Sequence, residues 1–454
     1  MLKFIHHIRH LFFLDKATSW GYAQKIAQSL QGFVAIFIIA YFIDLKTQGY
    51  LYTFVSLLSL QFVFELGLTQ VIITFVAYEK NGLHKKEPFV RGKYKNYIRF
   101  KNIASYAISW FTWASLGYFF VSLAIGFLIF YEPNEENNFW FYPYLLLCFV
   151  SSIQVFCISI YAIKEGLSAL DEVYKFRFIR TVLMIIFYGL LLMLGADLWS
   201  LSIAHTIIAI TDLYFLFLNK NLLGIAKKGK KNLKLFNWKT EMLPMQTKIA
   251  VASISGVLSF TVFVPLAFVM LGPEVAGRLG MSLAIVGGIS TLSIVPSVVS
   301  TQKMSALVES NNMNEANKLA KELILVSFVI HILSFFLLLS LYFFFQAYFP
   351  SLIERVLQPK IFIMLFISSM LGLITHPLAV YMRAHKEEPL MWVSILHGLF
   401  VSIGSYIGVV FFQVFGIGLA YLISGLVTFP VTLIIFWNFF KSKYSKERAM
   451  NNNG

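Results

Sequence analysis

The chain has 454 residues, of which 58% are hydrophobic and only 13% are charged. An ordinary soluble domain carries about 25% charged residues, so the composition excludes that class and favours a protein whose solvent is lipid. The formal net charge of +15 raises the question of nucleic acid. The cations, however, fall in short polar stretches between apolar runs, which is typical of membrane topology. We therefore expect membrane lipid around the chain and no nucleic-acid partner.

Apolar runs long enough to cross a membrane recur along the whole chain. A transmembrane helix needs about 20 mostly apolar residues. By this criterion the sequence predicts an all-α, polytopic membrane protein with about twelve transmembrane helices. The predicted spans are 20–43, 49–77, 102–131, 139–163, 179–195, 198–219, 245–271, 277–299, 319–347, 360–382, 389–412 and 415–440.

The distribution of cations predicts the orientation of these spans. Of the 37 Lys and Arg residues, those on the side opposite the N-terminus are Lys46, Arg278, Arg355 and Lys360. Lys and Arg are enriched in cytoplasmic connections. The expected protein is thus a multi-pass protein of the cell (inner or plasma) membrane, with both termini in the cytoplasm.

The longest basic connection predicts the domain organisation. It covers 220–244, follows the sixth span, and separates an N-terminal six-helix lobe at 20–219 from a C-terminal one at 245–440. Two lobes of this kind are expected to enclose a central cavity. Residues 1–19 are predicted to form an amphipathic segment on the cytoplasmic face, and 441–454 a cytoplasmic tail.

Polar side chains inside the spans are the first candidates for a site, because an ionisable group in hydrocarbon costs about 3 kcal/mol or more. In the first span, Gln24, Gln28 and Gln31 share one helical face, which is predicted to line a substrate cavity beside Lys25. Alternatively, Lys25 extends to the membrane interface. Lys248 lies at a corresponding depth in the seventh span, and it too either lines the substrate cavity or extends to the membrane interface.

Three further residues are candidates for ion coupling or for ion pairs. Glu65 lies inside the second span, where it pairs with Lys25, couples transport to a proton or cation, or packs as a neutral acid. His205 and Asp212 are seven positions apart, on one face of the sixth span. They form either a relay or separate hydrogen bonds to neighbouring helices.

The motifs of common enzymes are missing from the sequence. It contains no phosphate-binding glycine loop with Lys-Ser or Lys-Thr, no His-Glu-x-x-His motif and no Asp-rich cluster. The histidines of the spans are isolated and form a poor metal site. We expect no enzyme activity, no cofactor and no metal.

Short motifs in a fixed order along the spans show a resemblance to a known family. They are Gln48-Gly49-Tyr50, Glu65-Leu66-Gly67-Leu68, Gly272-Pro273-Glu274-Val275-Ala276-Gly277 and Asn314-Glu315-Ala316. With these motifs in this order, the chain resembles, over nearly its whole length, the polysaccharide-export branch of the multidrug/oligosaccharidyl-lipid/polysaccharide (MOP) flippase superfamily. The resemblance is to the O-antigen flippase type within that branch.

This resemblance implies a flippase that moves a lipid-linked oligosaccharide, carried on polyprenyl diphosphate, from the cytoplasmic to the outer leaflet by alternating access. It implies Lys25 and Lys248 as cations for the diphosphate, and a polysaccharide polymerase or ligase as a partner. Energy would come from an ion gradient or from onward use of the product.

Two other interpretations stay open. A cation-coupled multidrug exporter of the same superfamily usually has an acidic residue in the first span, and this chain has none between Ile26 and Ile43. A membrane scaffold, or the membrane part of a polymerase, is the third interpretation. For a polymerase we would expect a large outer loop with arginines, whereas the outer loops here are short.

Overall fold

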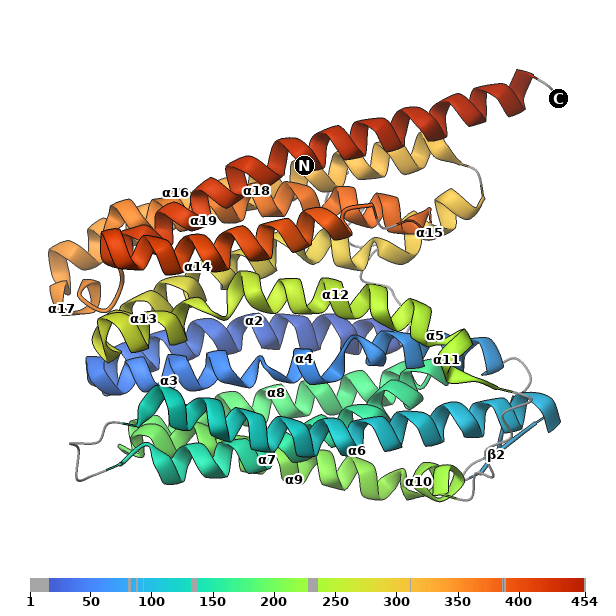
Figure 1. Cartoon of the computed structure of the whole chain (residues 1–454), viewed down its shortest axis with the longest axis horizontal. Coiled ribbons are helices and arrows are strands. Elements are labelled where there is room, and N and C mark those ends of the chain that lie inside the picture. Colours follow the sequence, from blue (N-terminus) through green and yellow to red (C-terminus); the bar gives the residue numbers. More distant parts are fainter. Residues whose placement is uncertain are drawn as a thin grey trace. The chain divides into compact units, whose positions relative to one another are not determined.

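The computed structural model describes residues 16–452, except for 81–82, 87–88, 93, 132–137, 228–235, 311, 386 and 388. Most of the predicted amphipathic segment at 1–19 lies outside the described residues. The described chain is almost entirely helical (Figure 1), and it divides into two compact units, 1–254 and 255–454.

The first unit contains a helical bundle and one small β-hairpin. Its elements are α2 (Lys16–Phe42), α3 (Leu45–Leu58), α4 (Gln61–Glu65), α5 (Leu68–Lys80), β1 (Leu83–Lys86), β2 (Phe89–Gly92), α6 (Tyr94–Phe130), α7 (Phe141–Gly166), α8 (Leu170–Met193), α9 (Asp197–Leu218), α10 (Lys220–Lys227), α11 (Trp238–Glu241) and α12 (Leu243–Phe260). The two strands pair antiparallel. Helices α10 and α11 occupy part of the connection that the sequence suggested as a linker, and the division between the units falls inside α12.

The second unit is also a helical bundle. Its elements are α13 (Phe263–Leu271), α14 (Pro273–Val299), α15 (Thr301–Glu309), α16 (Met313–Tyr348), α17 (Pro350–Ile353), α18 (Pro359–Ala384) and α19 (Met391–Asn452). Prolines occupy the first turn of α14, α17 and α18, where the missing N–H costs no hydrogen bond. Asn312 caps α16 by accepting a hydrogen bond from the Glu315 backbone N–H.

The predicted number of about twelve membrane helices is confirmed. Within the described residues, ten helices are long and apolar enough to cross a membrane, and a bent pair adds an eleventh. The last of the ten, α19, consists of two helices merged across Gln413, whose φ of 53° and ψ of −138° are not helical. Counting them separately gives twelve. Figure 1 shows the two parts of α19 lying side by side.

Two glycines hold this final helical hairpin together. A Cβ atom on Gly408 would lie 2.6 Å from the carbonyl oxygen of Gly416, and one on Gly416 would lie 2.0 Å from the oxygen of Gly408. The two backbones thus touch directly on either side of Gln413. Small residues permit this approach between membrane helices.

The second predicted span is not continuous. Expected at 49–77, it is broken between α4 and α5 and bent there by 44°. Leu66 and Gly67 at the break have φ values of 48° and 65°. Glu65 therefore ends a short helix instead of lying inside a long one. Glycine adopts this left-handed conformation without strain, whereas a side chain costs about 1–2 kcal/mol.

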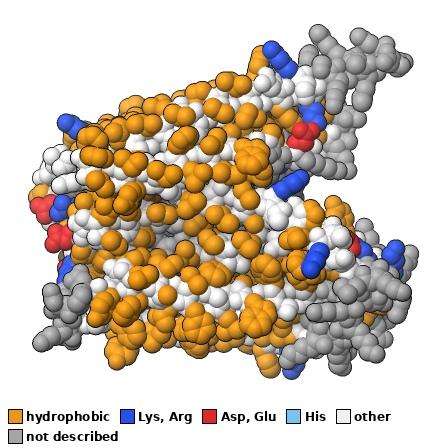
Figure 2. Space-filling view, in the orientation of Figure 1, with side chains coloured by type: hydrophobic (Ala, Val, Ile, Leu, Met, Phe, Trp, Pro, Cys, Tyr) orange, Lys and Arg blue, Asp and Glu red, His pale blue; other side chains and the backbone are white. Residues whose placement is uncertain are grey.

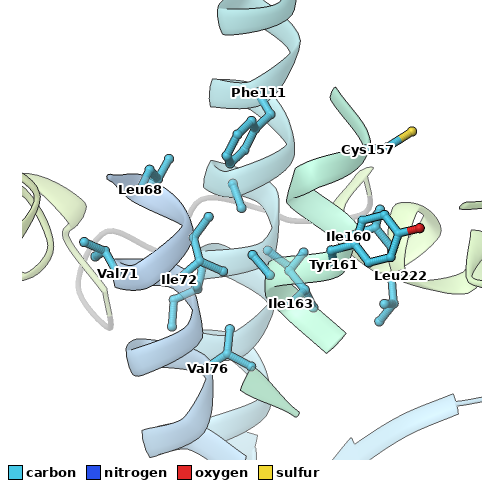
Figure 3. Close-up of a cluster of buried hydrophobic side chains, with 14 of the residues drawn as sticks. Leu68, Val71, Ile72, Val76, Phe111, Cys157, Ile160, Tyr161, Ile163 and Leu222 are labelled. Carbon is cyan, nitrogen blue, oxygen red and sulfur yellow. The ribbon is translucent and has the colours of Figure 1, made fainter. Parts of the chain in front are cut away.

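The core of the first unit lies between α5, α6, α7 and the end of α9. In Figure 3, Ile72 and Val76 of α5 point toward Ile163 of α7. Gly166 lets α7 approach closely, since a Cβ there would lie 2.6 Å from the Val76 Cβ. Because lipid is as apolar as these side chains, close packing rather than escape from water stabilises the contact.

The surface has the character expected of a chain in lipid. On the face shown in Figure 2, hydrophobic side chains cover the helices and charged side chains gather near the helix ends. Helix α16 illustrates this, with Leu325, Leu333, Phe336 and Phe343 all exposed by 59% or more. Such residues would be unfavourable in water and suit acyl chains.

At the end of the first unit predicted to be cytoplasmic, one arginine links three helices. Arg99 of α6 donates from Nε to Glu79 Oε1 of α5 and from Nη2 to Glu241 Oε2 of α11, each over 2.6 Å. The backbone N–H of Asn237 also donates to Glu241, over 3.2 Å. This arginine clamp attaches α11, and with it the start of α12, to the bundle.

The arginine clamp predicts a pH dependence of stability. Burial raises the pKa of Glu241, but hydrogen bonds from Arg99 and the Asn237 backbone, with the Arg99 charge, lower it more, to below its ordinary 4.5. When folding lowers the pKa of a carboxyl group, the ionised group stabilises the folded state at pH values above its ordinary pKa. This stabilisation is lost as the pH falls through the lowered pKa. Glu241→Gln should lower the unfolding temperature at about pH 7, with a difference that shrinks as the pH falls through the lowered pKa of Glu241.

Thermal unfolding of the purified chain across this pH range measures the effect. Glu387→Gln is the matched control, because Glu387 is half exposed and pairs, within the described chain, with Lys443. That variant should differ little from the wild type at any pH. A deficit of Glu241→Gln that persists unchanged in acid would contradict the prediction.

Candidate functional site

A polar pocket of about 240 Å³ lies inside the first unit, among α2, α7, α8 and α9. Its lining contains four glutamines, two arginines and a histidine, although these helices are otherwise strongly apolar. The lining residues are Gln24, Gln28, Gln31, Gln154, Arg177, Arg180, Thr181, Met184, His205 and Ile208. A pocket of this composition inside a membrane bundle is the strongest candidate for a binding site.

Helix α2 contributes the face of three glutamines expected from the sequence. Gln24 donates from Nε2 to Gln28 Oε1 over 3.4 Å, and Lys25 donates from Nζ to the same oxygen, also over 3.4 Å. Lys25 itself is exposed and is not among the lining residues. It lies at the edge of the pocket, bonded to a glutamine that lines it.

The two arginines of α8 were missed by the sequence analysis, which began the fifth span at residue 179 and assigned both to the cytoplasmic side. In the structure α8 begins at Leu170. Arg180 follows ten residues later, about 15 Å along the helix and close to its middle. The spacing of Arg177, Arg180, Thr181 and Met184 is that of one helical face. That face lines the pocket, and its periodicity could have revealed it.

One aromatic ring positions both arginines. The guanidinium groups of Arg177 and Arg180 lie 5.7 Å and 5.8 Å from the centroid of the Tyr161 ring. Tyr161 in turn stacks on Phe215 with a centroid distance of 4.3 Å. In Figure 3 the Tyr161 hydroxyl points away from the hydrophobic cluster around α5. Cation–π contacts contribute about 0.5–2 kcal/mol each, depending on how far the cation is shielded from water.

Each arginine also has an acidic partner outside the pocket lining. Arg177 pairs through Nη2 with Glu165 of α7, and Arg180 Nε lies 3.1 Å from Asp212 Oδ1 of α9. The Tyr161 hydroxyl donates to the same oxygen of Asp212 over 2.9 Å. The arginines are therefore charge-balanced in the structure.

Helices α7 and α9 run parallel, and their polar residues match at a constant offset. Gln154 of α7 lies beside His205 of α9, with 3.3 Å between Gln154 Nε2 and His205 Nδ1. One pair further along, Tyr161 lies beside Asp212. Both pairs are 51 positions apart. His205 thus lines the pocket, whereas Asp212 is only 1% exposed and lies behind Arg180.

Glu65 and Lys248 do not line the pocket. Glu65 nevertheless lies close enough to Arg177 of the lining for the two charges to attract each other, as Glu165 does. No ion pair joins Lys25 to Glu65 in the described part of the chain, so the pairing considered from the sequence is absent. Lys248 is exposed on α12. Coupling by Glu65 and anion binding by Lys248 stay predictions.

The lining determines what the pocket can bind. Its volume is smaller than the roughly 300–1,000 Å³ that drug-sized ligands occupy, so it suits one group, such as a phosphate, a diphosphate or a sugar ring. Two guanidinium groups favour an anion, and glutamine amides hydrogen-bond to phosphate or sugar oxygens. Among the described residues, no three His, Cys, Asp or Glu side chains are grouped as a metal site would require.

Comparison with known proteins identifies the fold. No protein-family model matches the chain, and no curated protein matches it. A solved inward-facing multidrug resistance MATE family transporter of the MOP superfamily is similar, with a TM-score of 0.63 at 12% identity, over 91% of this chain and 96% of that one. The lipid II flippase MurJ in an inward closed conformation gives a TM-score of 0.57 at 14% identity, over 92% and 86%.

A MOP superfamily transporter from Pyrococcus furiosus, described as having a binding pocket of reverse polarity, also gives a TM-score of 0.57, at 15% identity over 94% of this chain and 97% of that one. All three structures are transporters or flippases rather than enzymes. This protein is a multi-pass membrane protein with the fold of the MOP-superfamily transporters.

Proposed function

We propose that the protein is a flippase that translocates a lipid-linked oligosaccharide, on polyprenyl diphosphate, from the cytoplasmic to the outer leaflet for surface polysaccharide synthesis. The observation that carries this proposal is the pair of arginines, Arg177 and Arg180, in a polar pocket inside the bundle. The pocket takes the diphosphate or the first sugar, while the lipid tail stays in the membrane.

The fold supports this proposal, because a lipid II flippase and multidrug transporters share it. The lining of the pocket favours the flippase among these alternatives. It holds two cations and several amides, and no acidic side chain of the described residues belongs to it. A diphosphate gains charge-assisted hydrogen bonds from the two guanidinium groups, whereas the described lining offers a cationic drug no carboxylate to pair with. The membrane is the cell membrane, both termini are cytoplasmic, and a polymerase or ligase uses the product.

The test is made in the host cell. Deleting the gene should stop surface polysaccharide from appearing while the lipid-linked unit accumulates on the cytoplasmic side. The wild-type gene should restore export, and the double variant Arg177→Gln/Arg180→Gln should not. Lys443→Gln, which removes a partly exposed cation of α19 in the second unit, should restore it fully.

A different outcome supports the second candidate. If surface polymer stays normal in the deletion strain and the cells lose resistance to cationic compounds, the protein is a multidrug exporter. The flippase proposal is then wrong.

A further inference from the structure

Asp212 is a buried carboxylate with one oxygen unused. Its Oδ1 accepts a hydrogen bond from the Tyr161 hydroxyl over 2.9 Å and lies 3.1 Å from Arg180 Nε. Its Oδ2 is buried and has no hydrogen-bond partner among the described residues. An unsatisfied oxygen in such a place is costly while the group is ionised. Oδ2 is thus a ready site for a proton.

Arg180 is held by Asp212 only loosely. The contact of 3.1 Å from Nε to Asp212 Oδ1 lacks hydrogen-bond geometry, and Nε has no other hydrogen-bond partner among the described residues. The terminal nitrogens of Arg180, which belongs to the pocket lining, have no hydrogen-bond partner in the described chain. An anion in the pocket can therefore bind the guanidinium without breaking a hydrogen bond.

Charge balance then requires a compensating change. In the structure Arg177 is neutralised by Glu165 and Arg180 by Asp212. A dianion adds two negative charges to this neutral set, in a region where charges interact far more strongly than in water. Protonation of one carboxylate removes one of the excess charges.

The groups that face Asp212 narrow down which one responds. Tyr161 and Cys157 of α7 and the two arginines of α8 act on it, His205 lies two turns away on α9, and α3, also packed on α9, carries Lys46, Tyr50 and Tyr52. Asp212 is the carboxylate in this group. When Arg180 pairs with the anion, Asp212 loses its cationic partner, and protonation removes its unbalanced negative charge. His205 and Glu165, the carboxylate paired with Arg177, are the rival proton acceptors.

We propose that Asp212 takes up one proton when a dianionic group binds at Arg180, so that the anion and the proton occupy the first unit together. The proton comes from the buffered solution, whose acid form loses it, the new O–H bond forms at Oδ2, and Arg180 stays protonated and pairs with the anion. Anion binding and proton binding therefore favour each other. In an exchange mechanism the coupling would have the opposite sign, because the proton would displace the substrate. This inference rests on the anion site of the proposed function.

The experiment uses inorganic sulfate as the probe, because it stays dianionic from about pH 5 to about pH 8 and brings no titrating proton of its own. The purified full chain in lipid nanodiscs is titrated by calorimetry in buffers of different protonation enthalpy, which counts the protons taken up. The wild type should take up about one proton per sulfate. Its affinity should tighten by up to about tenfold for each unit by which the pH falls.

The variants assign the proton. Asp212→Asn should bind sulfate with almost no proton uptake and with an affinity independent of pH, and Asp212→Glu should restore the uptake. Glu172→Gln, which removes a carboxylate paired with Lys164 away from the pocket, should match the wild type. Unchanged uptake in Asp212→Asn, or loss of uptake only in His205→Gln or Glu165→Gln, would overturn the inference and leave the anion site intact. Failure of the wild type to bind sulfate would overturn both.

Discussion

The double variant Arg177→Gln/Arg180→Gln is expected to bind inorganic diphosphate at least about 100-fold more weakly than the wild type. Both guanidinium groups line the pocket. A hydrogen bond to a charged group contributes about 1.5–3 kcal/mol, and each 1.4 kcal/mol is a factor of ten in affinity. Calorimetric titration of the purified chain at about pH 7 measures the difference.

Three comparisons sharpen this result. Each single variant should lose part of the affinity, and replacement by lysine should fall in between, because lysine keeps the charge but not the two-pronged geometry. Lys164→Gln is the matched control. Lys164 is a cation of α7 paired with Glu172 of α8 at 2.6 Å, and it does not line the pocket. Diphosphate affinity that survives the double replacement would contradict the assignment of the pocket as an anion site.

Gly67→Ala is expected to destabilise the protein by about 2–5 kcal/mol. The left-handed conformation at this glycine, with φ of 65°, costs an alanine about 1–2 kcal/mol. A Cβ atom would also lie 2.2 Å from Ile249 Cγ2, and overpacking of this kind costs about 1–3 kcal/mol more. Thermal unfolding of the purified chain should show the loss.

Two other glycines separate the backbone cost from the steric cost. Gly195 has φ of 75° but nothing within 4 Å of an added Cβ, so Gly195→Ala should show the backbone cost alone. Gly32 has an ordinary φ and open space around it, and Gly32→Ala should be neutral or slightly stabilising. If the unfolding temperature falls no further in Gly67→Ala than in Gly195→Ala, the close contact with Ile249 does not contribute to the loss of stability.

The interruption at Gly67 illustrates where hydropathy analysis ends. Residues 49–77 read as one apolar run, because leucine, phenylalanine and valine continue on both sides of the break. The bend lies at the left-handed conformations of Leu66 and Gly67, where Ile249 packs against the glycine. Backbone conformation and side-chain packing do not change the average polarity of the run, so the sequence predicted one continuous span at 49–77.

The candidate site was only partly predictable for a related reason. The glutamines of α2 stood out because their spacing puts polar groups on one face of an apolar helix. Arg177 and Arg180 did not stand out, because basic residues near the end of an apolar run are usually interfacial. Only the extension of α8 to Leu170 brings both arginines into the bundle.

By itself the sequence determined the all-α class and about twelve spans, since the thickness of the hydrocarbon layer dictates the length of every apolar run. Tertiary structure alone decided which polar groups meet. It placed Arg180 beside Asp212 and Arg177 beside Glu165, and left Lys25 at the edge of the pocket. Helical periodicity shows which residues share a face, but the neighbour of that face depends on how α2, α7, α8 and α9 pack together.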